Sequence, residues 1–254
     1  MDRKILKLPF TLDGAPDWVC PTCQKAPLRI RKESFSKEEK SQSKDHSHEA
    51  WEPEWIEYIY SCMLLCANDQ CKEVVASGGT GSVRYAVGED ENGQPAEFYD
   101  DYFRPKFFVP NLKLLHVPEN CADTAVASAL ENSFVLFFAA PHAALSSVRI
   151  AIESLLTELK VRRFNVVDGK QRFINLHQRI ALLPGKWAHL KEMMLAIKWL
   201  GNAGSHNGGK EVTHDDVLDA YELTEHILQE VYAPKLSKLA KLAKKVNKKK
   251  GPAS

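Results

Sequence analysis

The stretch His142–Lys160, HAALSSVRIAIESLLTELK, is apolar on almost every side of a helical projection. Its alanines, valine, isoleucines and leucines leave little polar surface for solvent. A helix of this composition needs neighbours around its circumference, so we predict that it lies at the centre of a helical bundle. The flanking sequence must then supply the other helices.

Helical periodicity continues on both sides of this stretch, interrupted by Pro141 and by the pair Pro184–Gly185. Thr213 and Asp216 have the spacing of a capping box at a helix start. Short connections between long helices favour antiparallel neighbours, so residues 119–233 predict an antiparallel α-helical bundle. The further predicted helices are 123–140, 172–183, 186–200 and 215–231.

Two charged residues, Arg149 and Glu153, lie four positions apart on the central helix. An arginine before a glutamate is the less favourable order for an ion pair within one helix. Charges on so apolar a helix are rarely buried without partners, so we expect them to line a polar cleft; an exposed pair is the alternative. The segment Gly201–His206, GNAGSH, reads as a helix end that serves either the fold or a site.

Together these features resemble a known family. Arg149-x-x-x-Glu153, the run Lys198–His206 (KWLGNAGSH) and the Thr-capped helix that ends ILQEVY at Tyr232 are similar to the DUF4145 family, which is grouped with the HEPN superfamily of helical bundles. The resemblance covers roughly residues 119–233. It implies a bundle of bacterial antiviral-defence and restriction proteins, often dimeric, with HEPN relatives that are metal-independent endoribonucleases.

Those active relatives use an arginine, a following polar residue, and a histidine four to six residues after the arginine. Asn202 and His206 match the last two, but Gly201 stands where the arginine would be. RNA cleavage through the 2′-hydroxyl needs a base, for which His206 is the candidate, and a group that stabilises the phosphorane charge. Without the arginine, that charge would have to be stabilised by Lys198, Arg149 or a residue of a second subunit. The candidate catalytic residues are His206, Asn202, Arg149, Glu153 and Lys198.

The N-terminal third contains five of the six cysteines. The N-terminus has no apolar signal region and the apolar run Phe134–Ala140 is too short to cross a bilayer, so we expect a cytoplasmic protein with no membrane association. A reducing cytosol argues against disulfides. The spacing of C-P-T-C and C-A-N-D-Q-C instead predicts a zinc ribbon with one structural Zn²⁺. The predicted ligands are Cys20, Cys23, Cys66 and Cys71.

Other arrangements of this part remain open. Cys62 could replace Cys66, His46 and His48 could join the site, or the cysteines could be free core residues. Aromatic and β-branched residues predict strands at 55–66, 72–77 and 82–87, the last two joined by a turn at Gly78–Gly81. The predicted units are residues 1–97 as a ribbon with a polar loop at 33–54, 98–118 as an extended connector rich in proline and aromatic residues, 119–233 as the bundle, and 234–254 as a tail.

The predicted tail is strongly basic. Residues 235–254 hold eight lysines and no acid, and subtracting them from the formal net charge of +1 leaves −7 on the rest. Leucines at helical spacing make the tail a basic amphipathic helix that could bind nucleic acid, an anionic membrane or a partner's groove, or stay solvated. The candidate nucleic-acid-binding residues are Lys241, Lys244, Lys245 and Lys248.

The sequence therefore predicts an α+β protein, with a small N-terminal β zinc ribbon and a C-terminal HEPN-like bundle. The function expected first is a bacterial, cytoplasmic, defence-associated module that binds RNA, DNA or a defence-complex protein and forms a homodimer through its bundle. One alternative is an endoribonuclease effector that uses His206. Another is a scaffold subunit of a restriction-type complex.

Overall fold

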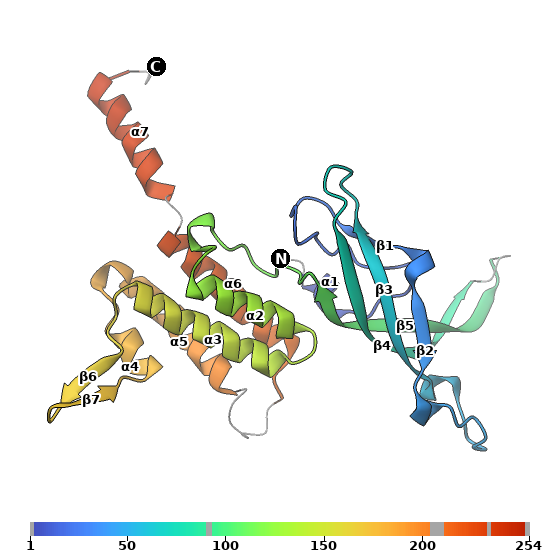
Figure 1. Cartoon of the computed structure of the whole chain (residues 1–254). Coiled ribbons are helices and arrows are strands. Elements are labelled where there is room, and N and C mark those ends of the chain that lie inside the picture. Colours follow the sequence, from blue (N-terminus) through green and yellow to red (C-terminus); the bar gives the residue numbers. More distant parts are fainter. Residues whose placement is uncertain (1–2, 90–92, 204–210, 233–234, 252–254) are drawn as a thin grey trace.

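The computed structural model describes residues 3–89, 93–203, 211–232 and 235–251. A curled antiparallel sheet forms the N-terminal part and helices form the C-terminal part, side by side in Figure 1. The predicted combination of an N-terminal sheet and C-terminal helices is confirmed. In the described ranges, no helix has both the length and the apolar character needed to cross a bilayer.

The sheet is built around β3, Glu57–Cys66. One edge of β3 pairs with β4 (Val74–Glu89), which pairs in turn with β5 (Pro95–Val109). The other edge of β3 is shared: β1 (Leu28–Ile30) pairs with its C-terminal end and β2 (Ser36–Glu39) with its N-terminal half. All of these pairings are antiparallel.

The two faces of β3 differ, as alternation along a strand requires. Tyr60, Cys62, Leu64 and Cys66 are buried, whereas Met63 is exposed. The buried face carries an aromatic cluster that continues into the helical part, where Phe108 of β5 meets Phe138 with ring centroids 5.0 Å apart. One core thus joins sheet and helices. Its aromatic members on the sheet side include Phe10, Trp18, Tyr60, Phe103 and Phe108.

Three expectations about this part are wrong. The glycines Gly78–Gly81 form no turn but lie within β4, where a Cβ on Gly79 would be 2.1 Å from the Arg104 carbonyl oxygen on β5. Glycine is needed there because the neighbouring strand approaches so closely. The polar segment 33–54 is not all loop, because it contains β2. Residues 98–109 are not a separate connector but part of β5, paired with β4 over its whole length.

The helical part is centred on α3, Pro141–Glu158, as predicted. It packs against α2 (Ala125–Phe137), α5 (Lys191–Ala203) and α6 (His214–Tyr232). The final helix, α7 (Lys235–Lys249), extends away from this group in Figure 1. The remaining helical segments are α1 (Lys4–Lys7), α4 (Leu176–Ala181) and short 3₁₀ turns at Lys32–Ser34, Ser41–Ser43, Pro53–Trp55, Glu119–Cys121 and Gly185–Leu190.

Two helix boundaries differ from the prediction. The helix expected at 172–183 begins only at Leu176, because the preceding residues form a hairpin of β6 (Phe164–Val167) and β7 (Lys170–Phe173). The helix expected at 186–200 starts five residues later and continues through Ala203, so Gly201 and Asn202 are helical. The predicted cap of α6 is confirmed, since the Thr213 hydroxyl accepts from the Asp216 N–H at 3.3 Å.

Candidate functional sites

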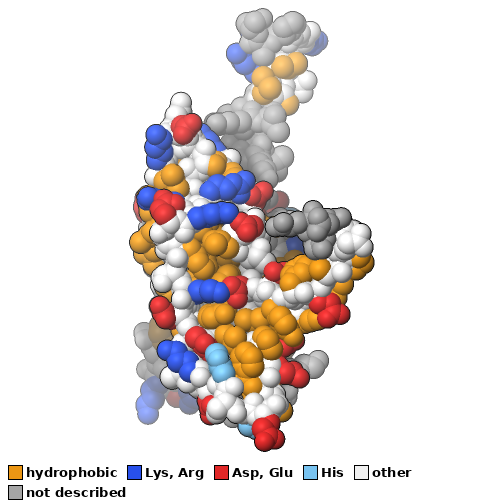
Figure 2. Space-filling view, turned by 90° about the vertical axis from the view of Figure 1, so that its right-hand side faces the viewer, with side chains coloured by type: hydrophobic (Ala, Val, Ile, Leu, Met, Phe, Trp, Pro, Cys, Tyr) orange, Lys and Arg blue, Asp and Glu red, His pale blue; other side chains and the backbone are white. Residues whose placement is uncertain are grey.

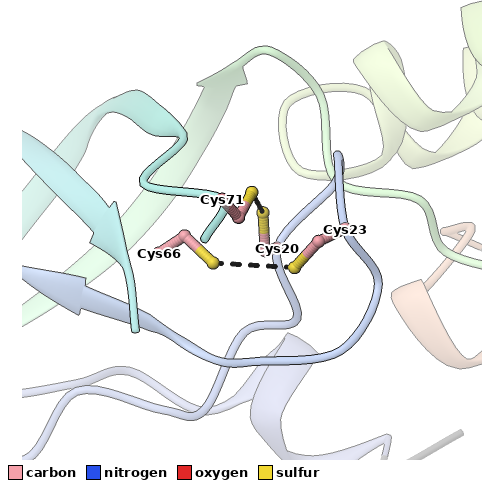
Figure 3. A group of neighbouring side chains, drawn as sticks. All are labelled: Cys20, Cys23, Cys66 and Cys71. Carbon is pink, nitrogen blue, oxygen red and sulfur yellow. Dashed lines mark hydrogen bonds between the residues drawn. The ribbon is translucent and has the colours of Figure 1, made fainter. Parts of the chain in front are cut away.

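Four cysteines from two separate turns meet at the end of the sheet (Figure 3). Cys20 and Cys23 belong to the turn before β1, Cys66 is the last residue of β3, and Cys71 lies just before β4. The Sγ atoms of Cys20 and Cys71 are 3.9 Å apart, those of Cys23 and Cys66 are 3.6 Å apart, and all four lie within 4.8 Å of one another. The predicted set of four is therefore brought together.

The two turns have matching backbone geometry. The residue after the second cysteine of each turn is left-handed, with φ of 53° at Gln24 and 50° at Lys72. Each first cysteine donates its N–H across the turn, from Cys20 to the Ala26 carbonyl and from Cys66 to the Glu73 carbonyl, both at 2.9 Å. Backbone folded in this way points N–H groups toward the sulfurs, as in the Asn68 N–H contact with Cys66 Sγ at 3.4 Å.

The four sulfurs fit a Zn²⁺ ion. Thiolates about 2.3 Å from a tetrahedral Zn²⁺ are about 3.8 Å from one another, close to the two Sγ separations above. Cys20 and Cys66 are buried and the other two are half-buried, which suits soft sulfur ligands. Four protein thiolates fill the coordination sphere and leave no position for a substrate, so such a site would stabilise the fold rather than catalyse.

The environments of the thiols are unequal. The backbone N–H of Lys25 lowers the pKa of Cys23 to about 6, whereas burial raises the pKa of Cys66 to about 12. Cys23 is therefore more readily deprotonated than Cys66. A bound cation would displace the remaining protons, so metal binding is expected to be coupled to proton release.

The alternative ligands lie elsewhere. Cys62 is 4% exposed on the same strand, outside the group of four, and burial raises its pKa to about 11. His46 Nε2 is 2.9 Å from Glu39 Oε1, and His48 Nδ1 accepts from the Ala50 N–H at 3.1 Å. Both histidines make their hydrogen bonds within the polar segment before β3, and neither belongs to the group of four sulfur ligands.

A second group of polar side chains joins α3 to α5. Arg149 Nε is 3.3 Å from Glu153 Oε1, and Arg149 Nη1 donates to Asn202 Oδ1 at 3.4 Å. The Arg149 side chain is 36% exposed and that of Glu153 30%, so the pair is neither sealed nor fully solvated. We call these three residues the Arg149 cluster.

Gly201 allows α5 to approach α3 at this cluster. A Cβ on Gly201 would lie 3.1 Å from Arg149 Cβ and 3.5 Å from the Leu145 carbonyl oxygen. Even an alanine there would require α5 and α3 to move apart by a few tenths of an ångström. An arginine at this position could be accommodated only if the helices moved apart.

The other predicted site residues have separate positions. Lys198 Nζ lies 3.3 Å from the centroid of the Trp199 ring, in a cation–π contact rather than in the Arg149 cluster. His206 lies outside the described residues, as does the side chain of Lys241. Lys244, Lys245 and Lys248 are exposed on α7.

Sequence reasoning missed Arg179, a residue of α4 that is 1% exposed and contacts the C-terminal end of α3. Its guanidinium donates to the Glu153 carbonyl at 3.1 Å, to Thr157 Oγ1 at 2.8 Å and to the Val161 carbonyl at 3.3 Å. Burial lowers its pKa from the usual arginine value. The sequence signal was faint, because nothing distinguishes this arginine from a surface one except the apolar residues around it.

Comparison with protein-family models finds one match in each half of the chain. Residues 8–108 match the model of DUF8608, a domain of unknown function, and residues 131–249 match that of DUF4145, another domain of unknown function. No curated protein and no solved structure matches the chain. The second match spans α3, α5, α6 and α7, including the Arg149 cluster. The chain therefore carries a DUF4145 domain at residues 131–249, behind a segment that matches DUF8608.

Proposed function

We propose that this protein is a nucleic-acid-binding module whose N-terminal part is a zinc ribbon stabilised by one Zn²⁺ and whose C-terminal part is a HEPN-like bundle. The resemblance of the bundle supports a role in cytoplasmic bacterial antiviral defence, with the module acting as a homodimer. In this proposal the metal organises the fold and the lysine-rich C-terminal helix supplies the contact with nucleic acid.

The observation that carries the proposal is the exposure of α7. Its described side chains from Leu242 to Lys250 include five exposed lysines, and the helix extends away from the other helices in Figure 1. The remainder of the chain is net acidic, so the positive charge is concentrated here. A protein that neutralises phosphates with lysines releases condensed counterions, which makes affinity fall steeply with salt.

The proposal is tested by fluorescence anisotropy with labelled RNA and DNA oligonucleotides over a range of salt concentrations. The triple variant Lys244→Gln, Lys245→Gln, Lys248→Gln should bind more weakly. For a single strand the slope of log K against log salt falls by about 0.7 for each phosphate that the protein no longer neutralises, hence by up to about 2 here. A slope unchanged by the triple variant would remove α7 from the interface.

A matched control replaces three exposed lysines outside α7 and outside the cysteine turns, Lys44, Lys106 and Lys113, with glutamine. The overall charge change is the same, so an equal loss of affinity would indicate a nonspecific effect of net charge. If the native protein binds neither RNA nor DNA at low salt, the scaffold function replaces the proposal.

A second candidate function, RNA cleavage, is favoured by the Arg149 cluster. The hydrogen bond from Arg149 to Asn202 brings a guanidinium beside a residue of the HEPN motif, where it could stabilise a phosphorane. His206, four residues after Asn202, would act as base or acid with a reference pKa of about 6.5.

This activity is tested by incubating RNA with the zinc-loaded protein without other divalent cations. We expect cleavage that is lost in both His206→Ala and Arg149→Ala. Cleavage that persists in these variants would indicate a contaminating nuclease, and no cleavage by the native protein would leave binding as the function.

A further inference from the structure

The hairpin of β6 and β7 follows α3 and precedes α4 in the chain, and it projects outward from the helices beside α4 (Figure 1). Asp168 and Gly169 form its turn with φ of 53° and 73°, the left-handed pair typical of a two-residue hairpin. Its base is fixed, because Val161 and Ile174 are buried and the Ile174 N–H donates to the Arg163 carbonyl at 2.9 Å. Every other residue from 162 to 173 is exposed except Asn165, which is half-buried.

This exposed hairpin carries large apolar side chains. Phe164 is 46% exposed, Phe173 58% and Val166 72%. A two-stranded hairpin is marginally stable alone, and this one has no layer packed over either face within the described part of the chain. Exposed apolar side chains in such a position are typical of a binding surface.

The hairpin is also strongly basic. Between residues 160 and 173 there are five cations and one acid, Asp168. None of the five cations makes an ion pair with another described residue. Their charge is therefore available to an anionic partner. The cations are Lys160, Arg162, Arg163, Lys170 and Arg172.

The aromatic and cationic groups are interleaved. Phe164 and Phe173 are directly paired across the strands, with ring centroids 5.8 Å apart at 75°. The Arg163 guanidinium lies 5.9 Å from the Phe164 centroid. Aromatic rings beside guanidinium groups suit a strand whose bases stack while its phosphates pair with the cations.

This chemistry favours a single strand over other partners. Bases inside a duplex are already stacked and offer no free face to a phenylalanine. The tip of the hairpin carries Asp168 and Gly169 between Val167 and Lys170, while the two phenylalanines lie at the base. Insertion of the tip into an anionic membrane would therefore leave the aromatic pair outside the bilayer. The order of the side chains along the hairpin therefore fits nucleobases stacked on the two phenylalanines, at the end next to the helices, and phosphates along the rest of the hairpin.

A cavity at the base of the hairpin continues this surface toward the Arg149 cluster. It has a volume of about 300 Å³, and its lining includes Ile150, Glu153, Arg163 and Arg179. Glu153 belongs to the Arg149 cluster as well, and Nε of Arg179 is buried without a partner among the described residues. The base of the hairpin thus lies directly beside α3, at a cavity whose lining also includes Glu158.

We infer that the β6–β7 hairpin binds single-stranded nucleic acid, with bases stacked on Phe164 and Phe173 and phosphates paired with Arg162 and Arg163. This inference rests on the proposed function and adds to it a second contact, distinct from α7, that selects single strands. The helix supplies affinity for any polyanion, while the hairpin discriminates between single strands and duplexes.

The test compares binding of a labelled oligo(U), an oligo(dT) of the same length, and a duplex, by fluorescence anisotropy. The double variant Phe164→Ala, Phe173→Ala should weaken single-strand binding at least tenfold, since loss of stacking on one base is worth about that factor or more. Its salt slope and its duplex binding should stay near native values. Arg162→Gln with Arg163→Gln should instead lower the single-strand salt slope by about 1.4.

The matched control is Phe98→Ala with Tyr99→Ala, two exposed aromatic residues of β5 in the part of that strand that pairs with β4. It should leave single-strand binding unchanged. Circular dichroism confirms that each variant is folded, as expected for exposed side chains. Vesicles of phosphatidylserine and phosphatidylcholine provide the membrane comparison.

The outcomes separate the two proposals. If the α7 lysine variant loses binding while the phenylalanine variant keeps native single-strand affinity, the inference is wrong and the proposed function stands. Equal losses for single strand and duplex, or a phenylalanine-dependent binding of vesicles alone, would also overturn the inference. If the native protein binds no nucleic acid, both fail.

Discussion

Replacing Gly201 with alanine probes the contact that holds the Arg149 cluster together. The added methyl group would lie 3.1 Å from Arg149 Cβ and 3.4 Å from Arg149 Cδ. Arg149 Cβ is fixed to the backbone of the central helix and cannot rotate away. Either α5 must move from α3 by a few tenths of an ångström or the strain must remain.

The expected magnitude is a balance of two effects. Overpacking a well-filled contact costs about 1–3 kcal/mol. Replacing glycine with alanine inside a helix raises the free energy of unfolding by about 1 kcal/mol through helix propensity. The net loss in the free energy of unfolding is therefore about 0–2 kcal/mol. For a chain of this size that corresponds to a fall of up to about 8 °C in Tm.

Gly201→Arg, which places a far longer side chain at the same contact, requires a far larger displacement. It should cost more than alanine and disrupt the contact between Arg149 and Asn202. If instead this variant were as stable as the native chain, the helices would not be closely packed at Gly201.

The assay is thermal unfolding followed by circular dichroism, together with urea unfolding. The matched control is Gly185→Ala, where an added Cβ would meet nothing within 4 Å. This control should be neutral or slightly stabilising. A Gly201→Ala protein more stable than its Gly185→Ala counterpart would refute the close contact between α3 and α5.

Three further predictions concern cysteine, serine and histidine. Cys66→Ser should abolish metal binding and unfold the N-terminal part. Cys62→Ser, on the same buried face of β3, should keep the metal and lower the free energy of chemical unfolding by about 1–3 kcal/mol. Equal loss of metal in the two variants would contradict the assignment of ligands. Ser133 donates to the Ala144 carbonyl, so Tyr221 must donate to Ser133, with both bonds at 2.8 Å. Ser133→Ala should therefore destabilise the protein more than Tyr221→Phe in urea unfolding, because it leaves a buried hydroxyl unpaired, and the reverse order would count against this network. Burial, aided by the charges of Lys106 and Arg104, lowers the pKa of His214, so the unfolded state binds a proton more readily and stability should fall as pH drops below about 6.5. His214→Gln should reduce that loss between pH 7 and pH 5.5, and an unchanged loss would assign it to other groups.

The sequence predicted those elements whose own residue pattern indicates whether they are buried, bind a metal or begin a helix. The uniform apolarity of His142–Lys160 indicated a central helix, and α3 is surrounded by three others. The spacing of the cysteines was sufficient to choose four of six, because short turns of this kind place both sulfurs on one side. The capping box at Thr213 set the start of α6 correctly.

Other features depended on partners distant in the sequence. Gly78–Gly81 read as a turn because the approach of β5 that requires glycine is not visible locally. The Asp168–Gly169 pair, flanked by valine and lysine, was itself a hairpin signal, but a helical pattern assigned from Arg172 obscured it. The role of Gly201 likewise became clear only from the position of Arg149 on another helix.

The most direct test of the central claim is the metal content of the full-length protein, followed by replacement with Co²⁺. Elemental analysis should find one zinc per chain, and the cobalt form should show the intense visible absorption of tetrahedral thiolate coordination. Removal of the metal should unfold the sheet and expose five reactive thiols, those of the four ligands and of Cys62. A folded chain that contains no metal, or a weak spectrum typical of six oxygen and nitrogen ligands, would contradict the account.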